Sequence, residues 1–341
     1  MSIPIFRPSV KRKELDSVLS TMVEDRLGHG TVAQTLVKEV GMYLGLDTGI
    51  ALREYGRAIE TAIECLEISR GEKIAISPLA PSIYMEVFFS RGIEPVFVDI
   101  DPDSGCMATE QLQLLPNGPV KAIVVTGTLG FIPDLEAVAG LGVPIIEDVT
   151  QCIGANTGMR KCGSYGSVVI LGMEPEDIIT SGGGALVFAR AKRETANLKR
   201  ISSIYPKTVF LQDMNAALGI VQIRSIEAFI AQRKEIAQVY TRALMRSRHR
   251  TLVQIGEAEN VHYSFPVLLD SGVKDVRQYA RKRNVDTTLA FEDSIYGKFE
   301  VTDQPCPHAQ SMILRCVLFP LYPSLGRKHA GEVEKVLSTL P

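Results

Sequence analysis

Apolar residues between positions 55 and 190 follow two periodicities that alternate along the chain. Residues 56–68 place Ile59, Ile63 and Leu66 on one helical face, and residues 80–92 and 132–141, with a short helix ending at 112–115, are also predicted to be helical. Short apolar runs separate them, at residues 73–77, 94–100, 120–127, 143–149, 167–172 and 184–189. Such runs are typical of strands buried on both faces, so the pattern predicts an α/β domain with a parallel-type sheet.

A different pattern follows in the last third of the chain. Helical spacing continues through residues 211–246, as Met214, Leu218 and Val221 show. Strands are then predicted at 261–269 and 316–321, and helices at 273–283 and 327–340. We therefore expect an N-terminal arm and helices (1–50), a large α/β domain (51–210), a long connecting helix (211–246) and a small α+β domain (247–341).

Composition and charge exclude several classes of protein. The net charge is −2, 45% of residues are hydrophobic, and no basic stripe points to nucleic acid. The longest apolar runs are too short for a membrane span, and residues 1–15 lack the apolar core of a signal peptide. Six cysteines form no CxxC pair and five histidines show no ligand spacing. We expect reduced thiols, a cytoplasmic location and no metal.

Candidate chemical groups lie where strands end, since open α/β sheets bind ligands at that edge. Glu147 and Asp148 close one strand, and Gln151 follows one turn later. An acid there suits a cationic ring nitrogen, a ribose or a metal, but capping the next segment is the more frequent role.

Two further stretches invite a functional interpretation. The glycine run at 181–184 offers backbone N–H groups to a phosphate, but it precedes a strand, so a turn between strands is the preferred interpretation. The carboxylates of Glu174, Glu176 and Asp177 would repel one another, and one of them, if buried, would have a raised pKa. A solvated loop is the simpler alternative.

Several segments together resemble one known family. They are residues 3–8, 92–105, 143–155, 160–167, 181–188, 214–223, 233–240 and 319–325. The chain resembles the DegT/DnrJ/StrS-type sugar aminotransferases, which are fold type I pyridoxal-phosphate enzymes. The resemblance implies a mostly parallel seven-stranded sheet flanked by helices, and a homodimer whose cleft is built from two subunits. In this family Asp148 would pair with the pyridine nitrogen, and Gln151 would lie against the ring.

The resemblance also shows what the chain lacks. The family's catalytic lysine matches Glu176 or Asp177, and no lysine occurs between Lys161 and Lys192. A carboxylate cannot form the imine that this chemistry requires.

Other positions of the implied cofactor pocket differ as well. Tyr55 and Gly56 stand where the family has a phosphate-binding Gly-Thr pair, and Pro81 stands near its stacking aromatic residue. Gly172 matches a serine, and Thr208 matches an asparagine that reaches across the dimer. These changes predict a vestigial pocket and no bound cofactor, with pyridoxal phosphate as the alternative.

Three functions follow from this resemblance. The first is a pseudoenzyme, or a partner or regulatory subunit, in sugar-nucleotide or natural-product biosynthesis, as a homodimer or as a heterodimer with an active paralogue. The second is an enzyme that reuses the cleft without the cofactor, with Glu176, Asp177 or Asp148 as acid or base. The third is an active sugar aminotransferase. The identity of the small-molecule ligand is left open, with a nucleotide sugar as one candidate.

Overall fold

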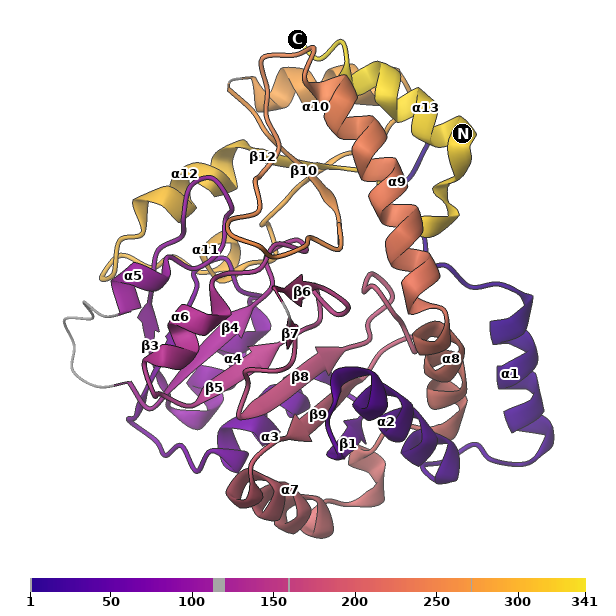
Figure 1. Cartoon of the computed structure of the whole chain (residues 1–341), viewed down its shortest axis with the longest axis vertical. Coiled ribbons are helices and arrows are strands. Elements are labelled where there is room, and N and C mark those ends of the chain that lie inside the picture. The colour runs from indigo at the N-terminus through magenta and orange to yellow at the C-terminus, as the bar shows by residue number, and fades with distance from the viewer. Residues whose placement is uncertain (1, 113–119, 159, 271) are drawn as a thin grey trace.

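Seven strands form the central sheet, in the order β1-β9-β8-β5-β4-β2-β3 (Figure 1). The computed structural model describes residues 2–112, 120–158, 160–270 and 272–341. The strands are β1 (Thr48–Leu52), β2 (Lys73–Ile76), β3 (Glu94–Phe97), β4 (Ala122–Thr126), β5 (Ile145–Asp148), β8 (Val168–Gly172) and β9 (Ala185–Ala189). Only β9 is antiparallel, to both of its neighbours. The predicted mostly parallel seven-stranded sheet is confirmed.

Both faces of this sheet are buried, which explains its continuous apolar strands. Alternate residues of one strand enter different hydrophobic clusters: Ile146 faces one, and Ile145 faces the other. The first face is covered by α3 (Tyr55–Cys65), α4 (Ile83–Arg91) and α7 (Lys192–Ile204). The second is covered by α2 (Thr31–Leu44), α6 (Leu135–Gly140) and α8 (Asp213–Arg224).

The prediction of one long helix over residues 211–246 is wrong, because this segment forms two helices, α8 and α9 (Ile226–Leu244). The two helices meet at an angle of 59°. Ser225 separates them with non-helical backbone angles, and its hydroxyl donates to the carbonyl of Val221 at 2.9 Å. No single described helix is long and apolar enough to cross a membrane. Among the described helices, only the bent pair of α8 and α9, taken together, has the length and composition of a membrane span.

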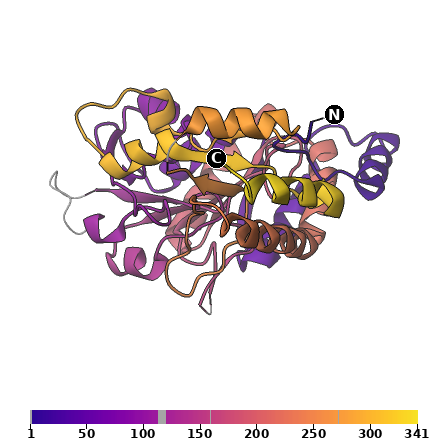
Figure 2. The same ribbon diagram turned by 90° about the horizontal axis from the view of Figure 1, so that it is seen from above.

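The C-terminal residues build a second, three-stranded sheet above the first (Figures 1 and 2). Its order is β10-β12-β11, all antiparallel. The strands are β10 (Phe265–Leu268), β11 (Thr288–Leu289) and β12 (Cys316–Phe319), and the helices nearby are α10 (Val273–Lys282), α11 (Ile295–Lys298), α12 (Pro307–Arg315) and α13 (Gly326–Leu337). Residues from α9, α10 and α13 form the third hydrophobic cluster, which Ile3 joins from the N-terminal segment.

The helices expected within residues 1–50 are α1 (Arg12–Val23) and α2. Several other elements were not predicted: α7, the edge strand β1, the small hairpin of β6 (Asn156–Thr157) and β7 (Arg160–Lys161), and α11, α12 and β11. The short helix predicted to end at 112–115 is α5 (Thr109–Leu112), and residues 113–115 lie outside the described residues.

The glycine run lies in the connection from β8 to β9, as the turn interpretation expects. Gly182, Gly183 and Gly184 all have positive φ, between 74° and 121°. At Gly184 a Cβ atom would lie 2.8 Å from the carbonyl oxygen of Leu52 and 2.6 Å from the Leu211 side chain. This glycine is therefore required by both backbone conformation and space.

Gly184→Ala should lower the free energy of unfolding by about 2 kcal/mol or more, because strain and overlap add. Gly331→Ala is the matched control, since Gly331 lies within α13 with no atom within 4 Å of its added Cβ. The control should be neutral or stabilising by up to about 1 kcal/mol. Denaturant titration measures both changes, and equal stabilities of the two variants would contradict the expectation.

Candidate functional site

The site is built around Asp148, the last residue of β5. Its carboxyl group accepts four hydrogen bonds. Oδ1 accepts from the Thr150 backbone N–H at 3.0 Å and the Thr150 hydroxyl at 2.5 Å. Oδ2 accepts from the hydroxyls of Tyr84, at 2.7 Å, and Tyr55. Asp148 is only 3% exposed, so these bonds replace the water that burial removes.

The two tyrosines come from helices that cover one face of the sheet. Tyr55 is the first residue of α3 and Tyr84 lies in the first turn of α4. Their rings meet edge to face, with centroids 6.3 Å apart. Burial, and then the charge of Asp148, raises the pKa of both phenols well above the ordinary value, so both remain hydrogen-bond donors.

An inner chamber of about 90 Å³ lies beside Asp148. It brings together six residues that the sequence analysis singled out: Tyr55, Pro81, Asp148, Gln151, Glu174 and Asp177. Its other lining residues are Thr126, Gly127 and Thr150. The Gln151 side-chain oxygen accepts from the backbone N–H of Leu129 at 2.7 Å, which fixes the amide at the chamber wall.

Asp177 and Glu176 have different surroundings, although both were candidates for the lysine position. Asp177 is half-buried in the inner chamber and accepts a hydrogen bond from the Glu174 backbone N–H at 2.7 Å. Burial, followed by the nearby charges of Asp148 and Glu174, raises the pKa of Asp177 well above the ordinary value. Glu176 is exposed and lines a different cavity.

This outer cavity, of about 290 Å³, adjoins the inner chamber. Pro81, Thr126, Gly127 and Gln151 line both. Its remaining walls are largely apolar and come from the N-terminal segment, the loop after β2 and the C-terminal sheet: Ile5, Phe6, Leu79, Phe291, Leu318 and Leu321. The described residues that line the two cavities include no lysine or arginine.

One polar group faces the outer cavity without a partner. Ser264 lines this cavity and is 9% exposed, and its hydroxyl has no hydrogen-bond partner. Its neighbour Tyr263 also lines the cavity, and burial raises the pKa of that phenol above its ordinary range. The hydroxyl oxygen is itself buried, so a ligand in this cavity would reach it only after the Ser264 side chain rotates.

Glu147, the other acid at the end of β5, has a structural role. Its carboxyl group accepts from the backbone N–H groups of Gly163, Tyr165 and Gly166 at 2.5–2.9 Å. Burial raises the pKa of Glu147. It lines neither cavity and holds the loop between β7 and β8.

Gly56 and Thr208 lie apart from this site. They line a separate surface groove beside the start of α3, together with Arg57. Gly172 lies next to Asp177: a Cβ at this glycine would be 3.2 Å from the Asp177 carboxyl. The position matched to a family serine therefore has no room for a side chain without movement of its neighbours.

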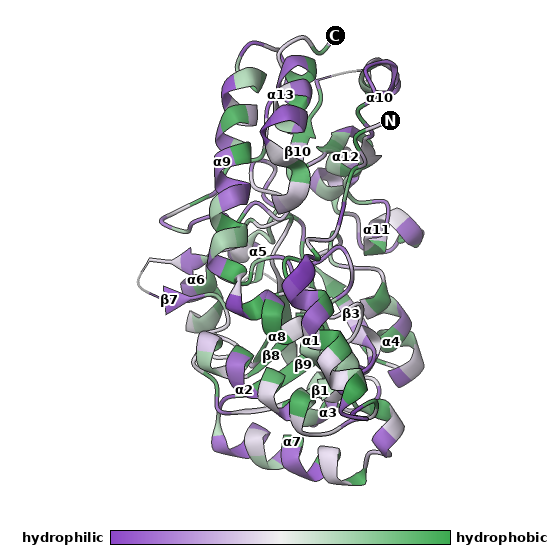
Figure 3. Cartoon of the chain, turned by 90° about the vertical axis from the view of Figure 1, so that its right-hand side faces the viewer, coloured by the Kyte–Doolittle hydropathy of each residue, from purple (hydrophilic) through white to green (hydrophobic). Residues whose placement is uncertain are grey.

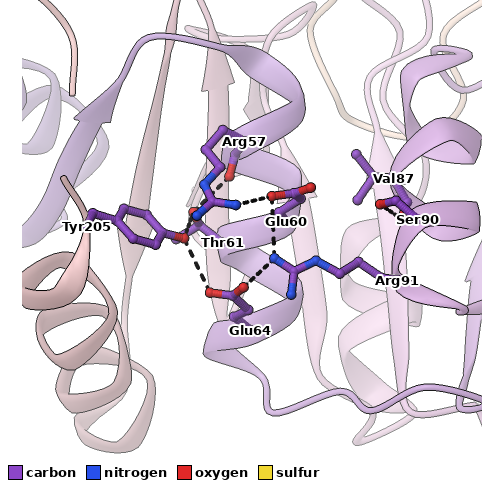
Figure 4. Close-up of polar contacts among 8 residues, drawn as sticks. All are labelled: Arg57, Glu60, Thr61, Glu64, Val87, Ser90, Arg91 and Tyr205. Carbon is purple, nitrogen blue, oxygen red and sulfur yellow. Dashed lines mark hydrogen bonds and ion pairs between the residues drawn. The ribbon is translucent and has the colours of Figure 1, made fainter. Parts of the chain in front are cut away.

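Two basic residues near the site have other partners. Arg57 pairs with Glu60 and stacks on the Tyr205 ring, within a polar network between α3 and α4 that includes Glu64 and Arg91 (Figure 4). Lys161 lies over the Tyr43 ring, 4.3 Å from its centroid. Neither contact reaches Asp148 or Asp177.

Sequence reasoning missed Tyr84, Thr150, Ser264 and Tyr263. The helical period places Tyr84 on the same buried face as Phe88, which predicts burial but not contact with Asp148. The role of Tyr55 was also predicted wrongly. The sequence analysis treated this position only as one where the family's phosphate-binding residue is missing, whereas its hydroxyl donates to Asp148. The described residues contain no group of three or more His, Cys, Asp or Glu side chains that could hold a metal ion.

The mostly parallel sheet covered on both faces, the smaller C-terminal sheet and the acid at the end of β5 form the arrangement that the resemblance to aminotransferases implies. Comparison with known proteins agrees with this class. The chain belongs to the DegT/DnrJ/EryC1/StrS aminotransferase family, whose model matches residues 8–338.

Relatives span nearly the whole chain. A dTDP-4-dehydro-2,3,6-trideoxy-D-glucose 4-aminotransferase of Saccharopolyspora spinosa is 24% identical over 373 residues, covering 98% of this chain and 97% of the relative. The solved aminotransferase TlmJ of Streptoalloteichus hindustanus superposes with a TM-score of 0.90 at 22% identity, covering 98% of both chains. The putative sugar aminotransferase Spr1654 of Streptococcus pneumoniae, in its PLP form, has a TM-score of 0.90 at 16% identity, covering 99% of this chain and 98% of its own. At these identities the solved structures show the fold.

Two predictions from the sequence are contradicted by these comparisons. The chain was expected to be a pseudoenzyme or a partner or regulatory subunit, but the relatives given above are named as aminotransferases. It was also expected to use no cofactor, but a relative of the same fold is known in a PLP form. The predictions failed because they took the missing lysine, together with the altered phosphate-binding and stacking positions, as the loss of the whole site. The structure retains a cleft with an oriented acid, an amide and an unpartnered hydroxyl.

The cofactor that this family implies is pyridoxal phosphate, and the residues around Asp148 do not fit it in this arrangement. Asp148 Oδ2 already accepts from Tyr55 and Tyr84, no lysine lies between Lys161 and Lys192, and no described lysine or arginine lines the inner chamber. The mechanism proposed below therefore uses only side chains of this chain.

The raised pKa of Asp177 gives the protein a pH-dependent stability. The folded state binds the Asp177 proton more tightly than the unfolded state, whose pKa is near the ordinary value of 3.8. Stability is therefore lost as pH rises from that value through the folded-state pKa. Asp177→Asn removes this loss, so its Tm should fall less than the wild-type Tm as the pH is raised from the ordinary aspartate value of 3.8.

Glu332→Gln is the control, because Glu332 is an exposed residue of α13 whose charge is not among the causes of the Asp177 shift. It should retain the wild-type pH profile, including the contribution of Glu147, whose pKa is also raised. Thermal unfolding across a pH series measures all three proteins. Parallel profiles for the wild type and Asp177→Asn would show that Asp177 does not carry this effect.

Proposed function

We propose that this protein is an enzyme of the sugar aminotransferase family that acts on a nucleotide-linked keto sugar. The observation that carries the proposal is the pair of adjoining cavities, in which Asp177 faces the inner chamber and Ser264 the outer cavity. The relative from Saccharopolyspora spinosa, whose name states a dTDP-linked keto sugar, supports this class of substrate.

The outer cavity suits the sugar end of such a substrate. Its volume of about 290 Å³ is at the lower end of the range for ligand pockets, and its walls are mostly apolar with a few polar groups. Since the described lining includes no lysine or arginine, the diphosphate would lie outside this cavity. The unpartnered Ser264 hydroxyl would bind a sugar oxygen.

Asp177 would act as the proton donor and acceptor. Its raised pKa keeps a proton on the carboxyl group at a higher pH than is usual for aspartate, as a general acid requires. The Glu174 N–H orients the carboxyl group, and Gln151, which is held by Leu129, lines the boundary between the two cavities. Proton transfer at the sugar carbon or oxygen nearest to the inner chamber is the reaction that these groups support.

The test is turnover of a dTDP-linked 4-keto-6-deoxyhexose by the purified protein with glutamate as amino donor. Parallel arms contain pyridoxal phosphate, pyridoxamine phosphate or neither, and mass spectrometry follows the sugar nucleotide. We expect conversion in at least one arm, with a loss of about 10²-fold or more in Asp177→Asn, the range for removal of a general acid or base.

Glu332→Gln serves as the control, because this exposed residue of α13 lies outside both cavities. It should convert the sugar at the wild-type rate. Failure of every arm with wild-type protein would contradict the proposal, and equal rates for the wild type and Asp177→Asn would remove Asp177 from the mechanism.

We also propose that the chain forms a homodimer through α1. This helix extends from one side of the molecule and packs on α8 through one face (Figures 1 and 3). Its outward face carries Leu15, Leu19 and Val23, which are 57%, 56% and 83% exposed. A cluster of exposed large apolar residues on one helix is typical of a surface that another protein covers.

Light scattering during gel filtration tests this proposal. Wild-type protein should have the mass of a dimer, and the double variant Leu15→Lys, Leu19→Lys should shift toward a monomer with unchanged circular dichroism. Ile204→Lys, at a separate exposed apolar residue on α7, should remain dimeric. A monomeric wild-type protein at micromolar concentration would contradict the homodimer, and would favour assembly with a different chain.

A further inference from the structure

Two cysteines that the proposed mechanism does not use lie in direct contact beside the site. The Sγ atoms of Cys152 and Cys162 are 2.8 Å apart, and each residue is 1% exposed. This separation is shorter than an ordinary non-bonded contact between two sulfur atoms, and a disulfide requires a further approach to about 2.05 Å. The other four cysteines, which are also buried, provide an internal comparison.

The backbone holds this pair together. The Cys162 N–H donates to the carbonyl of Ala155 at 2.9 Å, and the Ala155 N–H donates to the carbonyl of Cys152, also at 2.9 Å. Ala155 thus links the two cysteines through consecutive hydrogen bonds. The ten-residue separation between them closes a short loop, so little further ordering of the chain is needed to join the sulfurs.

We propose that Cys152 and Cys162 form a site of reversible disulfide formation that locks the segment carrying Gln151. Gln151 precedes Cys152 and lines both cavities. The Cys152 side chain packs on Gly127, where an added Cβ would lie 2.8 Å from the sulfur, and Gly127 also lines both cavities. The bond would therefore fix the wall that the two cavities share.

The oxidant is a small peroxide, and the electrons balance in two steps. The sulfur of one deprotonated thiol attacks a peroxide oxygen, breaks the O–O bond and forms a sulfenic acid, and the other oxygen leaves as hydroxide. The second sulfur then attacks the sulfenic sulfur and expels a second hydroxide. The two thiol protons convert both hydroxides to water, and the two thiols together lose two electrons.

The surroundings make the first step slow. The Cys162 thiol points toward Glu147 Oε1, 3.6 Å away. Its contact with Cys152, burial and the Glu147 charge raise the pKa of the Cys162 thiol well above the ordinary value. Because the thiolate is the reactive form, the pair should oxidise more slowly than an exposed cysteine. The completed bond would be shielded from exchange with other thiols for the same reason.

Peptide mapping tests the proposal on the full-length native protein. The protein is treated with hydrogen peroxide, its remaining thiols are alkylated in denaturant, and the digest is analysed by mass spectrometry. We expect one linked peptide pair, Cys152 with Cys162, and alkylation of the other four cysteines. The oxidised protein should show a Tm raised by about 3 °C and slower hydrogen exchange over residues 149–162, and dithiothreitol should reverse both.

Cysteine variants distinguish formation of the Cys152–Cys162 disulfide from oxidation of the other cysteines. Cys152→Ser and Cys162→Ser should each abolish the linked peptide and the Tm increase. Cys316→Ala is the control at a buried cysteine in β12, and it should retain both. Alkylation of all six cysteines after peroxide treatment, a Cys106–Cys152 link or a linked form with unchanged exchange over 149–162 would overturn the proposal. None of these outcomes depends on the turnover assay.

Discussion

The hydrogen bonding of Asp148 is the constraint on which the site depends. This carboxyl group lies at the buried end of β5, where four donors must replace water. Those donors come from α3, α4 and the loop after β5, so one acid determines how three segments meet. The arrangement leaves a small chamber beside the acid, and Asp177 and Gln151 form part of its lining.

The missing lysine has a limited consequence. It removes one covalent bond that the family resemblance implied, while the fold and the cleft remain. The chain belongs to an aminotransferase family, so the missing lysine and the altered pocket positions were together an insufficient reason to expect a non-catalytic protein. In this chain Tyr55 and Tyr84 both donate hydrogen bonds to Asp148, the acid that in the family resemblance would face the cofactor ring.

The order of the parallel strands in the sheet brings residues from separate parts of the chain into the site. Strands β4, β5 and β8 are parallel neighbours, so residues that follow them meet at one edge. Gly127, Gln151 and Asp177 follow these three strands and line the inner chamber. The same loop after β5 brings Cys152 to Cys162, which places a pair of thiols directly behind the chamber wall.

The sequence by itself determined six of the seven strands, their parallel-type sheet and the candidacy of Asp148, Gln151 and Asp177, because strand burial and strand ends follow from local periodicity. The mostly parallel seven-stranded arrangement was implied by the family resemblance. Only the tertiary structure decided that α8 and α9 are separate helices, and that Tyr84, distant in sequence from Asp148, bonds to it. It also separated Asp177 from Glu176, adjacent residues with the same chemistry. The reason is physical: side-chain partners, burial and the pKa shifts that follow depend on segments brought together by packing, which no local pattern records.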